Sequence, residues 1–384
     1  MNVPKLRFKE FNDEWSMIEL SKISSEISYG MGLPSKEYDG INKYIRITDI
    51  DENTSKYSNK DIVSPDGELE DKYIVKKNDI LFARTGASTG KTYLYDKKDG
   101  KLYYAGFLIK ANIINHDANF IFQQTHTSKY NRWIKVMSMR SGQPGINSQE
   151  YGSYKFSITS KTEEYKISKM LQLLDKKIEL QNKKIEDLKL FKLYTKNQIF
   201  KDYDEIFKLK DILVKWNKKN KNNSVKYVES ISNKYGFISQ SNQFEDRNVA
   251  SKDLNNYYII EKGVFGYNPS RLNVGSLALK TDDKASVVSP LYECFTTSQN
   301  NQYLLEWFDS KYFRKETISK FEGGVRNTLN FSNLCEIEIG LPTIEKQNKY
   351  SRIFKTFNNK IEFEVKKLYK LHELKKGLMQ SMFV

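Results

Sequence analysis

The chain carries one long helix-forming segment twice. Residues 164–200 align without a gap on residues 347–383, an offset of 183 residues (164 against 347). In both copies apolar residues recur at alternating steps of four and three, which is the period of a coiled coil. These positions are Ile167, Leu171, Leu174, Ile178, Ile185 and Leu188 in the first copy, and Tyr350, Phe354, Phe357, Ile361, Leu368 and Leu371 in the second. The chain is therefore predicted to alternate globule, helix, globule, helix.

The two helices are predicted to pair with each other. A helix of about 35 residues is about 50 Å long, and it is not stable in water with one apolar stripe exposed. The simplest partner for each stripe is the stripe of the other copy, and an antiparallel pair would place one globule at each end. The alternatives are that each helix packs on its own globule or on another subunit.

One polar residue interrupts the apolar stripe at the same place in each helix. These residues are Gln181 in the first copy and Glu364 in the second. In an antiparallel pair with pseudo-two-fold symmetry, the two positions would approach each other near the middle of the pair. A buried polar contact lowers stability but fixes register. We therefore predict that Gln181 and Glu364 set the register of the helix pair.

The repeat extends into the segments before the helices. At the same offset Asn147 matches Asn330, and residues 43–45 (KYI) match residues 226–228 (KYV). Residues 73–91 also resemble residues 258–276 when one gap is allowed. Two halves this similar indicate an internal duplication with an approximate two-fold relation.

Within the globules, short alternating runs rich in β-branched and aromatic residues predict strands. Residues 119–139 and 301–321 predict helices. The fold class is therefore predicted as α+β, with two strand-rich domains joined by two long helices that form an antiparallel coiled coil. The predicted boundaries are 1–161 for the first domain, 162–200 for the first helix, 201–343 for the second domain and 344–384 for the second helix.

Composition limits the cellular setting and the class of partner. The 384 residues are 39% hydrophobic, which is enough for folded domains, and the formal net charge of +15 favours a polyanionic partner such as nucleic acid. A Lys-rich surface without such a partner is the plainer alternative. The sequence has no run of about 20 apolar residues and no apolar signal segment, and it has two cysteines. We expect a cytoplasmic protein with no membrane contact.

A loop rich in hydrogen-bond donors follows one predicted strand in each half. In the first half the sequence TGASTGKT (85–92) resembles a phosphate-binding P-loop, but Thr85 stands where the first glycine is needed, and strands follow instead of a helix. We predict instead a loop that contacts phosphates or base edges, with an ordinary turn as the alternative. The candidates are Arg84, Thr85, Ser88, Thr89 and Lys91 in the first half, and Asn268, Arg271 and Asn273 in the second.

A second Gly-rich segment precedes the strand that leads into each helix. These segments are RSGQPGIN (140–147) and EGGVRNTLN (322–330). Loops on a rigid support are favoured places for recognition, although such residues also form turns. The candidates are Gln143, Asn147, Arg326 and Asn327.

Catalytic motifs are missing from the sequence. A DNA methyltransferase needs an F-x-G-x-G type loop and an N-P-P-Y-like tetrapeptide, and residues 321–324 (FEGG) and 267–270 (YNPS) match neither. A metal nuclease could be assembled only from a chance match at residues 65–66 and 96–98. The three histidines and two cysteines lack the spacing of zinc ligands. The sequence therefore predicts a binding protein with no catalytic residues and no bound metal.

The duplicated helix, the segments SGQPGIN and GGVRNTLN, and the run GLPTIEKQ (340–347) resemble the specificity subunits of type I restriction–modification enzymes. In that family the last run is a proline-containing helix start followed by Glu and Gln. Here Lys346 separates Glu345 from Gln347, and the first copy (TSKTEEYK) lacks both the Pro and the Gln. The resemblance covers nearly the whole chain.

The resemblance implies a division of labour. Each globule would be a target recognition domain that reads one half of a gapped, asymmetric site on double-stranded DNA. The helices would set the spacing and help to dock two modification (methyltransferase) subunits, and restriction/translocase subunits would join the same complex. S-adenosylmethionine, ATP and Mg would then be bound by these partners, and this chain would hold no cofactor. The alternatives are a coiled-coil scaffold with non-specific nucleic-acid affinity and a stand-alone DNA-modifying enzyme.

Overall fold

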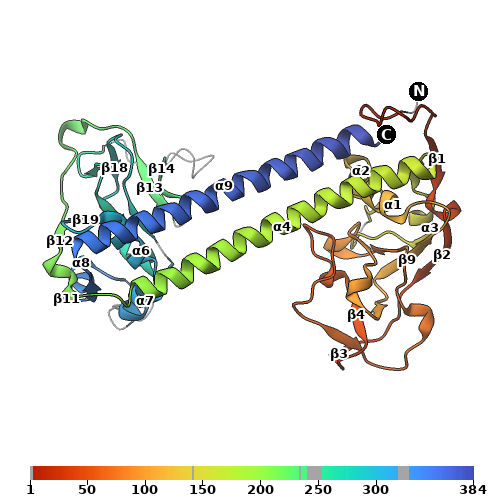
Figure 1. The fold of residues 1–384 in the computed structure, drawn as a ribbon, viewed down its shortest axis with the longest axis horizontal. Coiled ribbons are helices and arrows are strands. Elements are labelled where there is room, and N and C mark those ends of the chain that lie inside the picture. Colours follow the sequence, from red (N-terminus) through yellow and green to blue (C-terminus); the bar gives the residue numbers. More distant parts are fainter. Residues whose placement is uncertain (1–2, 141, 233–234, 240–252, 275, 319–327) are drawn as a thin grey trace. The chain divides into compact units, whose positions relative to one another are not determined.

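The computed structural model describes residues 3–140, 142–232, 235–239, 253–274, 276–318 and 328–384 (Figure 1). The chain forms two compact units. The first contains residues 1–182 and 367–384, and the second contains residues 183–366. Both limits fall inside the long helices, so each unit holds one domain together with a part of each helix.

The first unit is built on a four-stranded antiparallel sheet in the order β2-β9-β6-β7. Three two-stranded pairings surround it, of which β4 with β8 is parallel. The strands are β1 (Ser16–Glu19), β2 (Ser24–Tyr29), β3 (Ser35–Glu37), β4 (Lys43–Ile45), β5 (Val63–Pro65), β6 (Asp79–Ala83), β7 (Thr92–Leu94), β8 (Leu102–Tyr104), β9 (Leu108–Ile113) and β10 (Lys155–Ile158). This confirms the prediction of a strand-rich first domain.

Strand β6 is buried on both faces because a hydrophobic cluster covers each one. Ile80 and Phe82 belong to the cluster that includes the helices, whereas Leu81 and Ala83 belong to a second cluster on the opposite face. The alternation of side chains along a strand thus divides these residues between two cores. The central position of β6 gives rigid support to the segment that follows it.

The helix predicted over residues 119–139 is two helices in the structure. Helices α1 (Ala118–Gln124) and α2 (Ser128–Met137) are followed by the short helix α3 (Ser148–Ser153). The prediction of one helix is wrong because Thr127 starts a new one, since its side chain accepts a hydrogen bond from the amide of Tyr130. The segment predicted over 301–321 is divided in the same way, into α6 (Asn301–Phe308) and α7 (Lys311–Ile318).

The second unit repeats the plan of the first. Its four-stranded antiparallel sheet has the equivalent order β12-β19-β16-β17, and the short helix α8 (Phe331–Cys335) precedes its last strand. The strands are β11 (Glu205–Lys208), β12 (Leu213–Lys215), β13 (Glu229–Ser232), β14 (Gly236–Ser239), β15 (Tyr258–Ile260), β16 (Phe265–Tyr267), β17 (Leu277–Leu279), β18 (Ser286–Val288), β19 (Glu293–Thr297) and β20 (Glu338–Leu341). The predicted internal repeat is confirmed.

The two long helices, α4 (Lys161–Ile199) and α9 (Ile344–Met382), each have 39 residues and begin 183 residues apart (161 against 344). Parts of them run antiparallel within each unit. In the second unit Lys184 pairs with Glu364 at 2.7 Å, and farther along α4 the ring of Phe191 packs on Phe357 with centroids 5.4 Å apart. In the first unit Met379 and Met382 of α9 join the core that contains Ile167 and Leu171 of α4. Of the predicted apolar stripe, Ile167, Leu171, Leu174, Ile178, Ile185 and Phe354 are buried.

The residues predicted to set the helix register differ in burial. Glu364 is buried and forms its ion pair with Lys184. Gln181 is half-buried on α4. Their role in fixing the register stays a prediction.

Among the described helices, none has the combination of length and apolarity that a bilayer span requires.

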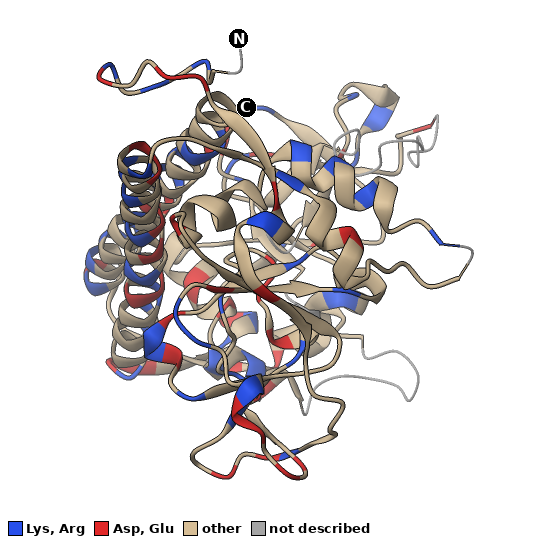
Figure 2. Ribbon diagram, turned by 90° about the vertical axis from the view of Figure 1, so that its right-hand side faces the viewer, with Lys and Arg blue, Asp and Glu red and all other residues tan. Residues whose placement is uncertain are grey.

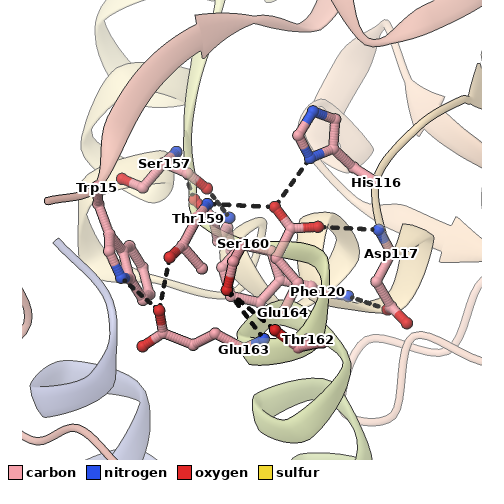
Figure 3. A network of polar contacts seen from close by, with 11 residues as sticks. Trp15, His116, Asp117, Phe120, Ser157, Thr159, Ser160, Thr162, Glu163 and Glu164 are labelled. Atoms are coloured by element: carbon pink, nitrogen blue, oxygen red, sulfur yellow. Dashed lines mark hydrogen bonds and ion pairs between the residues drawn. The ribbon is translucent and has the colours of Figure 1, made fainter. Parts of the chain in front are cut away.

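Two buried glutamates join the start of α4 to the first domain (Figure 3). Glu163 accepts hydrogen bonds from Arg7 Nε at 2.7 Å, Arg7 Nη2 at 2.8 Å, Thr159 Oγ1 at 2.5 Å and Trp15 Nε1 at 3.3 Å. Glu164 contacts His116 Nδ1 at 2.8 Å and accepts a hydrogen bond from the amide of Asp117 at 3.1 Å. This network fixes where the helix leaves the domain.

The second long helix begins with an equivalent contact. The amide of Asn300 donates to Gln347 Oε1 at 3.1 Å, just as the amide of Asp117 donates to Glu164. Asp117 and Asn300 are the N-caps of α1 and α6. Glu164 therefore stands in the first copy where Gln347 stands in the second, and both side chains connect a long helix to the helix pair of its domain.

Candidate nucleic-acid interface

The two loop segments predicted in the first domain lie side by side. The amide of Gly86 donates to the carbonyl of Pro144 at 2.9 Å, and the amide of Ile146 donates to the carbonyl of Arg84 at 2.9 Å. Thr85 and Gly145 also form an antiparallel bridge. Residues 84–91 and 140–147 thus form one surface, called here the first loop pair.

Arg84 is the best-positioned cation of the first loop pair. Its Nε donates to the carbonyl of Gly106 at 3.0 Å, and its guanidinium carbon lies 5.0 Å from the ring centroid of Tyr29. The Tyr29 hydroxyl in turn accepts a hydrogen bond from the amide of Ser148 at 3.0 Å. Within the described residues no partner is found for the Nη donors of Arg84, so they can bind a base edge or a phosphate.

Other predicted residues of the first loop pair hold its shape. Thr89 Oγ1 donates to the carbonyl of Gly86 at 2.8 Å, inside the turn that contains the single-turn helix η4 (Gly86–Ser88). Lys91 forms an ion pair with Glu52 at 2.6 Å. A side chain at Gly86 would come within 2.9 Å of Gln143 Nε2, so Gln143 lies directly over this turn. Ser88 is half-buried and Gln143 is exposed.

Asn147 caps a helix. Its side-chain oxygen accepts a hydrogen bond from the amide of Glu150 at 2.8 Å, and the Glu150 carboxylate accepts one from the amide of Asn147. Arg140 pairs with Glu150 at 2.5 Å. Asn330 caps α8 in the same way in the second unit. The matched asparagines therefore have a structural role in both copies.

The second unit contains an equivalent loop pair. The amide of Leu329 donates to the carbonyl of Pro269 at 3.1 Å, which joins the segment after β16 to the segment before α8. The side chain of Asn268 accepts a bond from the amide of Ser270 at 3.0 Å, and Arg271 is exposed. The backbone of Asn273 lies in the 3-10 helix η8 (Pro269–Val274). Arg326 and Asn327 lie outside the described residues.

Two aromatic residues were missed by the sequence analysis. Tyr29 is 40% exposed and stacks on Arg84, and Phe107 is 56% exposed beside it, with its carbonyl accepting a bond from the amide of Arg84. In the sequence analysis, aromatic residues served only as a sign of strands. Both residues are far from Arg84 in the sequence, so no local pattern marks them.

The loop at 85–92 is not a P-loop, because β7 follows it where a helix would be needed. Among the described residues, no group of three or more His, Cys, Asp or Glu side chains could hold a metal ion. Burial raises the pKa of the Cys294 thiol to about 12, so it does not supply a thiolate near neutral pH.

The charges of the chain are mixed. Figure 2 shows Lys and Arg interspersed with Asp and Glu along the ribbon instead of gathered in one segment. The fold and the loop pairs define a class of protein: a duplicated α+β protein with one loop pair in each half.

The similarity to known proteins narrows this class. Residues 12–190 match the family model described as the type I restriction modification DNA specificity domain. The type I restriction enzyme MjaVIII specificity subunit of Methanocaldococcus jannaschii is 23% identical over 343 residues, covering 80% of this chain and 79% of that protein. The putative MjaX specificity subunit of the same organism is 25% identical over 199 residues, covering 47% of this chain and 45% of that protein.

Two solved structures share the fold. The type I restriction–modification S subunit from M. genitalium gives a TM-score of 0.62 at 15% identity, covering 100% of this chain and 99% of that chain. A chain from a study of complex assembly and conformational transition of the type I system gives 0.57 at 13% identity, covering 96% and 97%. Residues 12–190 therefore resemble the type I restriction modification DNA specificity domain, and the chain shares the fold of these two structures.

Proposed function

We propose that this chain selects the DNA site of a type I restriction–modification complex. Each domain reads one half of a gapped, asymmetric site, and the long helices set the spacing between the half-sites and dock the modification subunits. The observation that carries the proposal is the duplicated loop pair: the amide of Ile146 bonds the carbonyl of Arg84 in the first unit, and the amide of the equivalent Leu329 bonds the carbonyl of Pro269 in the second. The same support thus carries different side chains in the two halves, as two different half-sites require.

Arg84 is proposed to contact a base, because two neighbours orient its guanidinium while its Nη donors stay available. Thr85, Ser88 and Gln143 supply further donors beside it, and Lys91 adds positive charge at the edge. In the second domain Asn268 and Arg271 are proposed to have the equivalent role, together with Asn273, Arg326 and Asn327.

The chain is proposed to act without catalysis of its own. Two modification subunits would bring S-adenosylmethionine and methylate adenine, and restriction/translocase subunits would bring ATP and Mg. The chain would work on double-stranded DNA in the cytoplasm. This assignment is supported by the similarity of residues 12–190 to the type I restriction modification DNA specificity domain.

Methylome sequencing tests the function. Cells that express this chain with its modification subunit should acquire one gapped adenine-methylation motif. Exchange of residues 1–161 for another such domain should change one half of that motif and leave the other half intact. A change in both halves, or methylation without a bipartite motif, would refute the proposal that each domain reads one half-site. Binding that depends on salt but not on sequence would favour the scaffold alternative.

A matched pair of variants tests the site. Arg84→Ala should relax base preference at one position of one half-site, at a cost of about 1–3 kcal/mol in binding. Arg314→Ala removes the same charge from an exposed side chain on α7 and should leave the motif unchanged. If both variants weaken binding equally on every DNA sequence, Arg84 contacts only phosphates.

A further inference from the structure

A cavity of about 510 Å³ lies in the first unit between α2 and the C-terminal part of α9. Five of its lining residues are cationic, and none is acidic. The cations are Lys129, Arg132, Lys155, Lys375 and Lys376. This concentration of positive charge lies outside the loop pair already described.

Two of these cations have a polar partner. Lys375 forms an ion pair with Asp175 at 2.6 Å, and Lys129 Nζ donates to the main-chain oxygen of Val384 at 3.1 Å. Arg132, Lys155 and Lys376 are exposed, and the described part of the chain provides no ion pair for any of them. The cavity therefore has an excess of positive charge that an anionic ligand would offset.

In the second unit, ion pairs neutralise the lysines at the equivalent end of α4. Lys192 and Lys196 of α4 are the equivalents, at the 183-residue offset, of Lys375 and Met379. Lys192 pairs with Glu306 at 2.8 Å, and Lys196 pairs with Asp309 at 2.8 Å.

The first unit compensates its lysine in another way. The first copy has Gln123 and His126 at the positions of Glu306 and Asp309, and the partner of Lys375 is Asp175, which replaces Asn358 of the second copy. The excess charge of the cavity comes from other positions. Where the first copy has Lys155 and Lys376, the second copy has Glu338 and Leu193.

The cavity also has an apolar side, to which Tyr154, Met379 and Phe383 contribute. Tyr154 is 6% exposed and Met379 is 7% exposed, so this part is fixed by the core. Its volume is in the range of small-molecule sites. A matching ligand combines a flat, largely apolar ring with an anionic group.

We propose that this cavity binds a nucleoside phosphate, with the ring against Tyr154 and Met379 and the phosphate near Arg132 and Lys376. The nucleotide is either free in solution or a unit of a DNA strand. Both sources present the same chemistry. The proposal does not depend on the DNA-reading role, and its failure would leave that role untouched.

Calorimetric titration of the full chain with deoxyadenosine monophosphate tests the proposal. Saturable binding at one site is expected, with weaker binding of deoxyadenosine and of inorganic phosphate. Arg132→Ala and Lys376→Ala should each weaken the affinity about tenfold. Lys315→Ala is the matched control, because Lys315 on α7 is the equivalent of Arg132 in the second unit, and it should have no effect.

Unchanged circular dichroism and Tm will show that the variants fold. Displacement of the nucleotide by a DNA oligonucleotide would identify DNA as the source, and lack of displacement would identify a free nucleotide. The absence of saturable binding would overturn the proposal, as would an equal loss in Lys315→Ala. Binding of polyglutamate without binding of the nucleotide would also overturn it, in favour of an acidic protein segment.

Discussion

Replacement of Glu163 tests whether the buried network at the start of α4 holds the helix to the first domain. The carboxylate is fully buried and receives four hydrogen bonds, two of them from Arg7, whose side chain is 12% exposed. Glu163→Ala would leave the guanidinium of Arg7 and the indole N–H of Trp15 without their acceptor. Removing one partner of a buried ion pair costs about 3–5 kcal/mol.

A conservative variant separates charge from shape. Glu163→Gln keeps the volume and one acceptor but loses the charge, so we expect a smaller loss of about 1.5–3 kcal/mol. The control is Glu10→Gln, which removes an exposed ion pair with Lys166 and should leave the stability nearly unchanged. Urea unfolding gives the free energies, and hydrogen exchange of residues 155–175 assigns the loss to the first unit. A change below about 0.5 kcal/mol in Glu163→Ala would refute the reasoning.

The pH dependence gives an independent readout of the same network. Burial alone would raise the pKa of Glu163, but hydrogen bonds from Arg7 and Thr159 outweigh burial and hold the pKa below its usual range. A carboxylate with a lowered pKa in the folded state stabilises the protein fully above its unfolded value, about 4.3. This stabilisation disappears as the pH falls through the folded value. The stability difference between the natural chain and Glu163→Gln should therefore shrink in acid, and a constant difference would contradict this assignment.

Three further predictions concern the repeat. Asn147→Ala and Asn330→Ala each remove a helix cap and should destabilise their own unit by about 1 kcal/mol. Hydrogen exchange in α3 and α8 measures this loss. An effect on DNA binding alone would show that capping is not the role of these residues. Leu171→Ala should lower the free energy of unfolding in urea by about 2–5 kcal/mol, because Leu171 is fully buried. Leu173→Ala is the control, because this side chain on the same helix is 60% exposed, and it should have little effect. Equal losses would contradict the assignment of Leu171 to the buried apolar stripe. Replacing both Gln181 and Glu364 with Leu should raise the Tm and allow the two helices to pair in more than one register. Cysteine cross-linking between the helices detects the registers. An unchanged Tm with a single register would show that these residues do not set the register.

Two candidate residues of the first loop pair were predicted from local sequence signals. Arg84 was predicted from a donor-rich turn after a strand, and Gln143 from a Gly-rich turn before one. Their proximity was not predictable, because the bond between Gly86 and Pro144 joins residues 58 positions apart (86 and 144). Asn147 was predicted as a contact residue, and in the structure its side chain caps α3. The cap depends on the neighbouring amide of Glu150, and the contact with DNA stays a prediction.

The sequence by itself determined the duplicated plan and the two long helices. The helix predicted over 162–200 spans Lys161–Ile199, because a heptad pattern depends on neighbours three and four positions away and is fully local. Tertiary structure alone decided the pairing of the recognition loops, the exposure of Tyr29 and Phe107 beside Arg84, and the uncompensated charge of the cavity near α9. These features depend on which distant segments the sheet order brings together. The periodicity of a sequence carries no information about such contacts.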